Sequence, residues 1–103
     1  MRNEELLIRL TQTQGIAGYE KKVRELIEQE VRPYADELIV DPLGSLIAVK
    51  KGKGGPHPKK IMFAAHMDEI GFMVKKIEED GRLLVCNVGW NWTASAYNTR
   101  VVF

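Results

Sequence analysis

The first third of the chain carries hydrophobic residues at helical spacing. Two apolar stripes are present: Leu6, Leu7 and Leu10, and then Val23, Leu26, Ile27 and Val31. The first stripe lies between Asn3 and Gly15, and the second runs from about residue 20 to residue 32. Pro33 ends the second stripe because the residue before a proline avoids helical geometry. This pattern predicts two amphipathic helices joined by a loop over residues 15–20.

From residue 37 the hydrophobic period changes to that of strands. Residues 37–40 and 45–49 flank Asp41-Pro42-Leu43-Gly44, whose Asp, Pro and Gly positions fit a type I turn. Residues 71–77 and 82–88 flank a second turn that contains Asp80-Gly81. The pattern therefore predicts two hairpins. Cys86 lies in a strand that is apolar on both faces, so we expect it to pack as a small hydrophobic residue.

An unbroken apolar run, Ile61 to Ala65, lies between the two hairpins and predicts a strand covered on both faces. The run ends at His66-Met67-Asp68. In an extended chain, residues two apart face the same side, so the side chains of His66 and Asp68 can contact the same ligand. An imidazole and a carboxylate together suit a divalent metal. The same triplet is also compatible with a structural histidine that makes local hydrogen bonds and binds no metal.

The C-terminal part predicts a loop over residues 89–93 and the start of a new strand at Thr99–Phe103. A strand with nothing after it leaves its edge and its apolar tail unprotected. Two tryptophans, Trp90 and Trp92, add to this apolar end. The order of two helices, a hairpin, a buried strand and another hairpin predicts an α/β fold with a mixed sheet, apparently truncated.

Composition removes several classes of function. The net charge is +1, from 15 basic and 14 acidic residues, which predicts no nucleic-acid partner and no anionic membrane surface. No apolar run approaches the ~20 residues of a membrane span, and the N-terminus lacks a signal-peptide pattern. A single cysteine, Cys86, excludes an internal disulfide and favours the cytoplasm.

His57 lies between two prolines in a glycine-rich loop, where we expect it to be exposed and without a function.

Residues 64–74, Ala-Ala-His-Met-Asp-Glu-Ile-Gly-Phe-Met-Val, resemble the cytosolic glutamyl/deblocking aminopeptidases. Members of this family build tetrahedral twelve-subunit particles, and some relatives carry an endoglucanase label. Gly15–Glu20 looks like the family's Gly-x-Ser/Ala-Gly-Tyr-Glu loop, and Asp41–Leu46 looks like its Asp-x-x-Gly-Asn-Leu hairpin. Arg100-Val101 sits where the family enters its inserted β-barrel domain. The glycanase label has no support, since no paired carboxylates are placed to attack a sugar.

The resemblance implies a zinc-peptidase-like α/β/α catalytic domain whose N-terminal part is residues 1–89. Residues 90–103 would begin the connection to the inserted domain. It implies that His66 is a ligand to one of two active-site metals, zinc or cobalt, and that Asp68 is the catalytic-site carboxylate that orients His66. The implied activity is removal of N-terminal residues from a peptide substrate, by a homo-oligomer in the complete family form. Glu69 receives no catalytic role.

The family's other metal ligands and its catalytic glutamate would lie beyond Phe103. We therefore expect the 103 residues alone to bind metal weakly or not at all and to be inactive, although they belong to an enzyme family. The alternative is a non-enzymatic fragment or subunit that associates with a partner through its unfinished strand edge. A third interpretation is another dinuclear metallohydrolase, such as a carboxypeptidase-like or deacylase-like enzyme, since these also place His-x-Asp after a strand.

Overall fold

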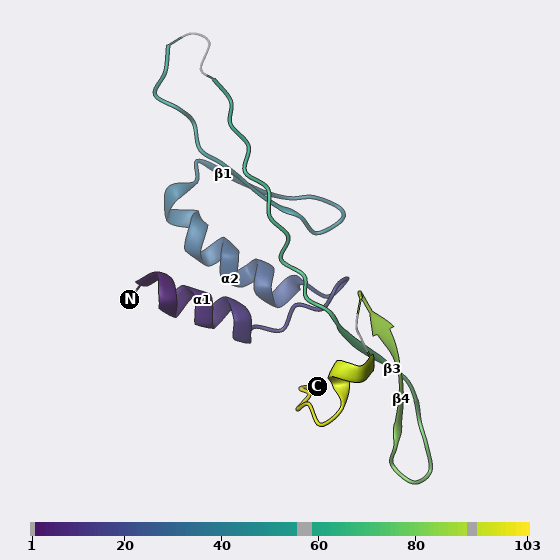
Figure 1. Cartoon of the computed structure of the whole chain (residues 1–103). Helices are drawn as coiled ribbons and strands as arrows, with labels where there is room; N and C mark the ends of the chain where they lie inside the picture. Colours follow the sequence, from purple (N-terminus) through teal and green to yellow (C-terminus); the bar gives the residue numbers. More distant parts are fainter. Residues whose placement is uncertain (1, 56–58, 91–92) are drawn as a thin grey trace.

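Two helices open the structure, as the apolar stripes predict. The computed structural model describes residues 2–55, 59–90 and 93–103. Helix α1 (Arg2–Gln12) and helix α2 (Lys21–Val31) are joined by a loop, and the short 3-10 helix η1 (Arg32–Tyr34) follows (Figure 1). An ion pair between Arg9 Nη1 and Glu30 Oε1, 2.5 Å apart, ties the two helices together.

Both predicted hairpins are confirmed. Strand β1 (Glu37–Val40) pairs antiparallel with β2 (Leu46–Val49), and β3 (Gly71–Ile77) pairs antiparallel with β4 (Leu83–Val88). Each turn closes with a backbone hydrogen bond over 3.0 Å, from Gly44 N–H to Asp41 O and from Gly81 N–H to Glu78 O. Gly44 and Gly81 have φ values of +92° and +84°, which L side chains rarely adopt.

Few contacts connect these elements. Arg24 of α2 donates from Nη1 to the carbonyl of Gly44 over 3.1 Å and holds the β1–β2 turn against the helix. A parallel bridge between Ile16 and Glu69 joins the helix–helix loop to the start of β3. The α/β class is confirmed, and in the described ranges the strands form two separate two-stranded sheets.

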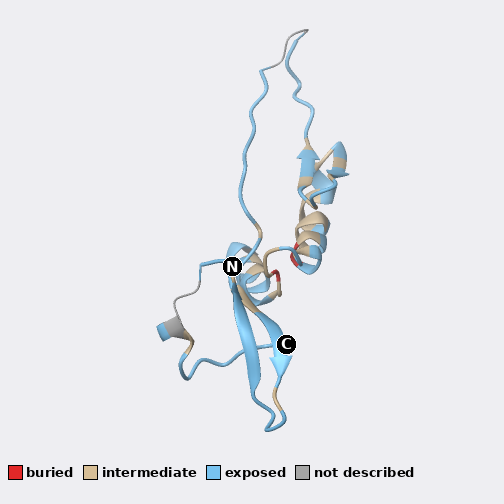
Figure 2. Cartoon of the chain, turned by 90° about the vertical axis from the view of Figure 1, so that its right-hand side faces the viewer, coloured by how far each residue is buried: buried red, intermediate tan, exposed pale blue. Residues whose placement is uncertain are grey.

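The described part of the chain encloses almost no core. Val23, 5% exposed, is the buried hydrophobic residue of the described part. Most of the ribbon in Figure 2 has the colours of exposed or intermediate residues. The chain exposes 9628 Å², whereas a compact monomer of this mass exposes about 5,900 Å². Its radius of gyration is 18.5 Å, against about 13 Å for a compact domain of 100 residues. Most of the apolar surface that the sequence pattern assigns to a core is therefore open.

The prediction of a buried strand at Ile61–Ala65 is wrong for this chain. Residues 59–68 run as an extended segment outside any strand, on one side of the long arch in Figure 1. Phe63, in the middle of the run, is 94% exposed. A strand needs a neighbour to pair its backbone and layers to cover its faces. Neither hairpin pairs with residues 61–65, so the run has no such neighbour in the described structure.

Two further predictions are wrong for the same reason. Cys86 is exposed, because no layer covers the β3–β4 hairpin, and its Sγ lies 3.7 Å from the carbonyl oxygen of Met73. The chain after the 3-10 helix η2 (Thr93–Ala96) is irregular, so Thr99–Phe103 forms no strand in the described structure. The predictions for His57 and Trp92 fall outside the described residues. Neither of the long helices in the described ranges combines the length and apolar character of a membrane span.

Candidate functional site

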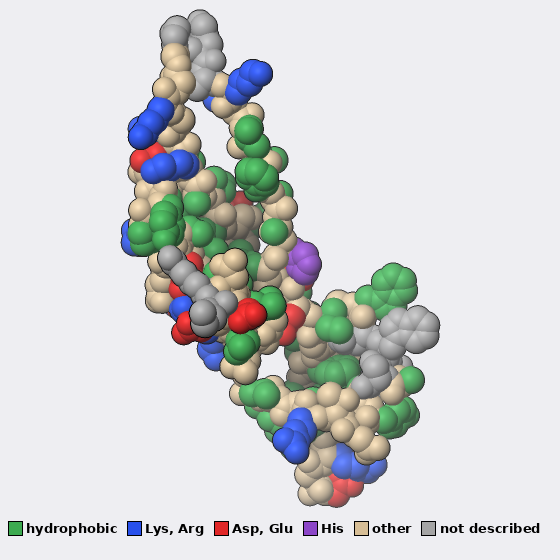
Figure 3. Space-filling model, turned by 60° about the vertical axis from the view of Figure 1, so that its left-hand side comes forward, with side chains coloured by type: hydrophobic (Ala, Val, Ile, Leu, Met, Phe, Trp, Pro, Cys, Tyr) green, Lys and Arg blue, Asp and Glu red, His purple; other side chains and the backbone are tan. Residues whose placement is uncertain are grey.

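His66 and Asp68 lie where the extended segment 59–68 meets the beginning of β3. The side chain of His66 is 85% exposed and stands out from the surface as the purple side chain of Figure 3. Asp68 is also exposed, with 45% of its side chain accessible. The pair is therefore accessible to a small ion or a substrate. Both residues lie outside the two hairpins.

The structure brings the two side chains together, as their spacing predicts. Nδ1 of His66 lies 3.2 Å from Oδ1 of Asp68 and 3.1 Å from the carbonyl oxygen of the same residue. A carbonyl and a carboxylate only accept hydrogen bonds, so Nδ1 must carry the proton that is shared between them. In the neutral ring Nε2 then keeps a free lone pair, which is the form of histidine that binds a metal.

The donor set fits part of a metal site. Within the described ranges, no group of three or more His, Cys, Asp and Glu side chains is placed to hold an ion. Catalytic zinc is held by three protein ligands, and His66 with Asp68 supplies one imidazole and its supporting carboxylate. These residues alone therefore do not complete a metal centre.

Glu69, to which the sequence assigned no role, is the residue that connects this site to the helical part of the molecule. Its N–H donates to the carbonyl of Gly15 over 2.8 Å, and its own carbonyl accepts from the N–H of Ala17 over 3.3 Å. Its carboxylate oxygen Oε1 accepts from the N–H of Gly15 over 2.9 Å. Sequence reasoning missed these contacts because the partners lie 54 residues apart. The only signals were a glutamate directly after the triplet and a glycine in the loop.

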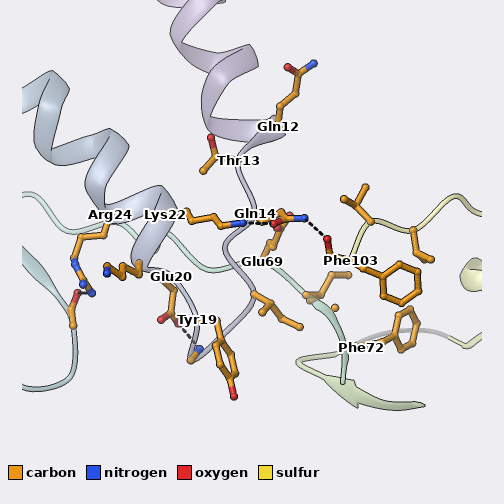
Figure 4. A pocket seen from close by; sticks show the side chains of 18 of the residues that line it. Gln12, Thr13, Gln14, Tyr19, Glu20, Lys22, Arg24, Glu69, Phe72 and Phe103 are labelled. Carbon is orange, nitrogen blue, oxygen red and sulfur yellow. Dashed lines mark hydrogen bonds between the residues drawn. The ribbon is translucent and has the colours of Figure 1, made fainter. Parts of the chain in front are cut away.

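An open groove of about 1690 Å³ lies beside this connection, between the helix–helix loop, β3 and the C-terminal tail (Figure 4). Its lining includes Glu69 and Phe72 but neither His66 nor Asp68. Gln14 bridges two of its walls by accepting from Lys22 Nζ over 2.7 Å and donating to the carbonyl of Phe103 over 3.4 Å. The groove and the His66–Asp68 pair are therefore different features, and the chemistry suited to a metal belongs to the pair.

Comparison with known proteins decides the family. Residues 44–103 match the family model described as M42 glutamyl aminopeptidase. The chain belongs to this family. The resemblance read from the sequence motifs is therefore confirmed.

Individual relatives agree with this assignment. A putative aminopeptidase of Acetivibrio thermocellus is 52% identical over 85 residues, which are 82% of this chain and 24% of the relative. The lysyl aminopeptidase of Pyrococcus furiosus is 41% identical over 86 residues, which are 82% of this chain and 24% of that protein. The chain thus spans about a quarter of the length of the curated relatives it matches.

Solved structures show the same fold. The TET aminopeptidase of the marine sediment archaeon Thaumarchaeota archaeon SCGC AB-539-E09 superposes with a TM-score of 0.79 at 36% identity, over 89% of this chain and 25% of that one. A Thermotoga maritima protein named endoglucanase superposes with a TM-score of 0.73 at 42% identity, over 81% of this chain and 26% of that one. The helices and hairpins of this chain therefore take the arrangement of one part of these larger structures.

Proposed function

We propose that the 103 residues form part of a metal-dependent aminopeptidase. In it, His66 binds one metal of the active site and Asp68 orients the imidazole of His66. The observation that carries the proposal is the contact of His66 Nδ1 with Asp68 over 3.2 Å, which leaves Nε2 available in a member of the M42 family. The proposed reaction is hydrolysis of the N-terminal residue of a peptide. The remaining ligands would come from further polypeptide.

Each residue of the pair has a separate task. His66 offers the lone pair of Nε2, while the Asp68 carboxylate accepts the Nδ1 proton, fixes the ring and raises its basicity. A metal bound there would act as a Lewis acid toward a peptide carbonyl and a water molecule. The exposed position of His66 leaves room for ligands from other segments.

The finer assignments belong to the same proposal. The metals would be zinc or cobalt, two for each complete site, and the active form would be a homo-oligomer. Residues 1–89 would belong to the catalytic domain, and residues 90–103 would lead into an inserted β-barrel domain. The single cysteine of the chain supports a reducing, cytoplasmic location.

A chimera tests the proposal. Residues of this chain replace the matching segment of the Pyrococcus furiosus lysyl aminopeptidase, and turnover of an aminoacyl-anilide is measured with added zinc or cobalt. We expect turnover by the chimera, its loss in His66→Ala, and a decrease of about 10- to 100-fold in Asp68→Asn. The isolated 103-residue chain should show no turnover, because its donor set is incomplete.

His57→Ala in the same chimera is the matched control, since it removes the only other histidine that this chain contributes. Wild-type turnover in the His66→Ala chimera would refute the ligand role of His66. Metal-dependent turnover by the isolated chain would refute the claim that its metal site is incomplete.

The open apolar surface favours a second candidate function. Exposed hydrophobic side chains along the unpaired segment, Phe63 among them, suit a non-enzymatic subunit that associates with another polypeptide. A monodisperse monomer in solution would count against this second function.

A further inference from the structure

The peptide group between Asp68 and Glu69 is held from both sides. Its N–H, which belongs to Glu69, donates to the carbonyl of Gly15 over 2.8 Å. Its carbonyl, which belongs to Asp68, accepts from Nδ1 of His66 over 3.1 Å. A trans peptide group is planar, so its N–H and C=O point in opposite directions. Fixing the N–H on Gly15 therefore fixes the direction in which the carbonyl meets the histidine ring.

The side chain of Glu69 strengthens the same attachment. Oε1 accepts from the N–H of Gly15 over 2.9 Å, and the carbonyl of Glu69 accepts from the N–H of Ala17. Gly15 is buried, so its N–H cannot turn to water if the carboxylate is removed. Figure 4 shows Glu69 beside the loop that joins α1 to α2. One residue thus binds this loop through its N–H, its carbonyl and its side chain.

Two glycines near the bridge between Ile16 and Glu69 lie against neighbouring side chains and leave no room for a side chain of their own. A Cβ at Gly15 would lie 2.7 Å from Cγ1 of Val23, and a Cβ at Gly71 would lie 2.5 Å from Cδ1 of Ile16. Real Cβ atoms show no such contacts. A larger residue at Gly15 or Gly71 would therefore disturb the packing on either side of the Ile16–Glu69 bridge.

We propose that Glu69 is a positioning residue, which binds the 15–17 loop and thereby holds His66 as the Nδ1–H tautomer with Nε2 free. The use of Nε2 for a metal rests on the proposed function, whereas the positioning itself needs no metal. The carboxylate acts as a hydrogen-bond acceptor, so its charge is not required. Glu69 differs in this respect from a metal ligand or a catalytic base, which would need the ionised group.

Two variants of the 103-residue chain separate these roles. Glu69→Ala removes the acceptor, whereas Glu69→Gln keeps an oxygen at the same position without the charge. Hydrogen-exchange mass spectrometry follows the amides of residues 13–19, and ¹⁵N spectra of labelled histidine report the ring tautomer at about pH 8, where a typical imidazole is neutral. The amides of the β1–β2 hairpin serve as the control for folding.

In Glu69→Ala we expect protection of the Gly15 amide to fall about tenfold or more and the Nδ1–H form of His66 to lose population. Glu69→Gln should restore both. Unchanged protection and tautomer in Glu69→Ala, or equal losses in the alanine and glutamine variants, would overturn the proposal. A Gly15 amide that exchanges in the unsubstituted chain as fast as an unstructured peptide would overturn it too, even if Glu69→Ala fails to fold.

The readouts involve no metal and no substrate, so they are independent of the chimera experiment. If Glu69 behaves as expected and the His66→Ala chimera keeps its turnover, the proposed function fails and the positioning stands. If the chimera behaves as expected and Glu69→Ala changes nothing, the positioning fails and the proposed function stands.

Discussion

At the scale of single residues, the site depends on positions where a side chain would not fit. Gly15 carries both a hydrogen-bond acceptor and a donor for Glu69, and a Cβ added to it would meet Val23, the one buried hydrophobic residue of the described structure. The β-branched side chain of Val23 has little rotamer freedom in a helix, so it cannot move away from an added methyl group. The sequence shows a glycine in a loop and gives no sign of this contact.

Gly15→Ala should therefore destabilise the chain. The new Cβ would meet Val23 Cγ1 at 2.7 Å, and overpacking of this kind costs about 1–3 kcal/mol. Thermal unfolding followed by circular dichroism measures the effect. Gly55→Ala is the matched control, because a Cβ there meets nothing within 4 Å, and surface substitutions of this type stay within about 0.5 kcal/mol. Equal midpoints for the two variants would contradict the close approach at Gly15.

At the scale of elements, local chemistry accounts for the hairpins. Asp41 begins the β1–β2 turn, and its Oδ1 accepts from the N–H of Leu43 over 2.9 Å and of Ser45 over 2.8 Å. These partners lie within four residues, so the turn forms from neighbours along the chain. The bond from the Ser45 backbone lowers the pKa of the Asp41 carboxyl below its ordinary value. A backbone bond from Lys51 lowers the pKa of Asp36 in the same way.

The lowered pKa of Asp41 predicts a loss of hairpin stability in acid. The unfolded carboxyl keeps its ordinary pKa of about 3.9, so the unfolded state binds more protons in the window below that value. The stabilisation is complete above the ordinary pKa and disappears as the pH falls through the lower pKa of the folded state. The amide shift of Ser45, followed from pH 5 downwards by NMR, measures this loss.

Asp41→Asn is the matched variant, because its amide oxygen still accepts the two turn bonds but does not titrate. Its Ser45 amide should be insensitive to acid, apart from the separate contribution of Asp36. An acid transition of the same size in Asp41→Asn and in the unsubstituted chain would rule out Asp41 as its source.

At the scale of the whole molecule, the chain has more apolar surface than it can cover. Its 9628 Å² of exposed surface and its radius of gyration of 18.5 Å belong to an open shape. The apolar run at residues 61–65 and the hairpin β3–β4 both lack a covering layer in the described structure. Exposed apolar patches of this kind mark surfaces that associate with other polypeptide.

The chain should therefore associate in solution. Size-exclusion chromatography with light scattering should give a mass above 11.7 kDa, and Phe63→Ser should reduce the association because Phe63 is central in the exposed run. Leu43→Ser is the matched control, since Leu43 is 92% exposed but lies in a turn outside the run. A monodisperse monomer would contradict the expectation and count against the non-enzymatic subunit. Equal masses for the two variants would show that the run is not the contact.

Features that depend on neighbours along the chain can be predicted from the amino-acid sequence. The two helices follow from apolar spacing, and the hairpins follow from Asp41-Pro42-Leu43-Gly44 and from Asp80-Gly81. The meeting of His66 with Asp68 follows from a separation of two residues in extended backbone. The family motifs are also local runs of residues, which is why they identified the M42 family without a structure.

The contacts between distant segments and the burial of apolar runs depend on the tertiary structure. The contact of Glu69 with Gly15 spans 54 residues, and no periodicity encodes it. The run at residues 61–65 has the pattern of a buried strand, yet burial requires a neighbouring strand and covering layers that the described elements do not supply. Pattern sets the local conformation of the chain, whereas covering a surface requires a second surface placed against it.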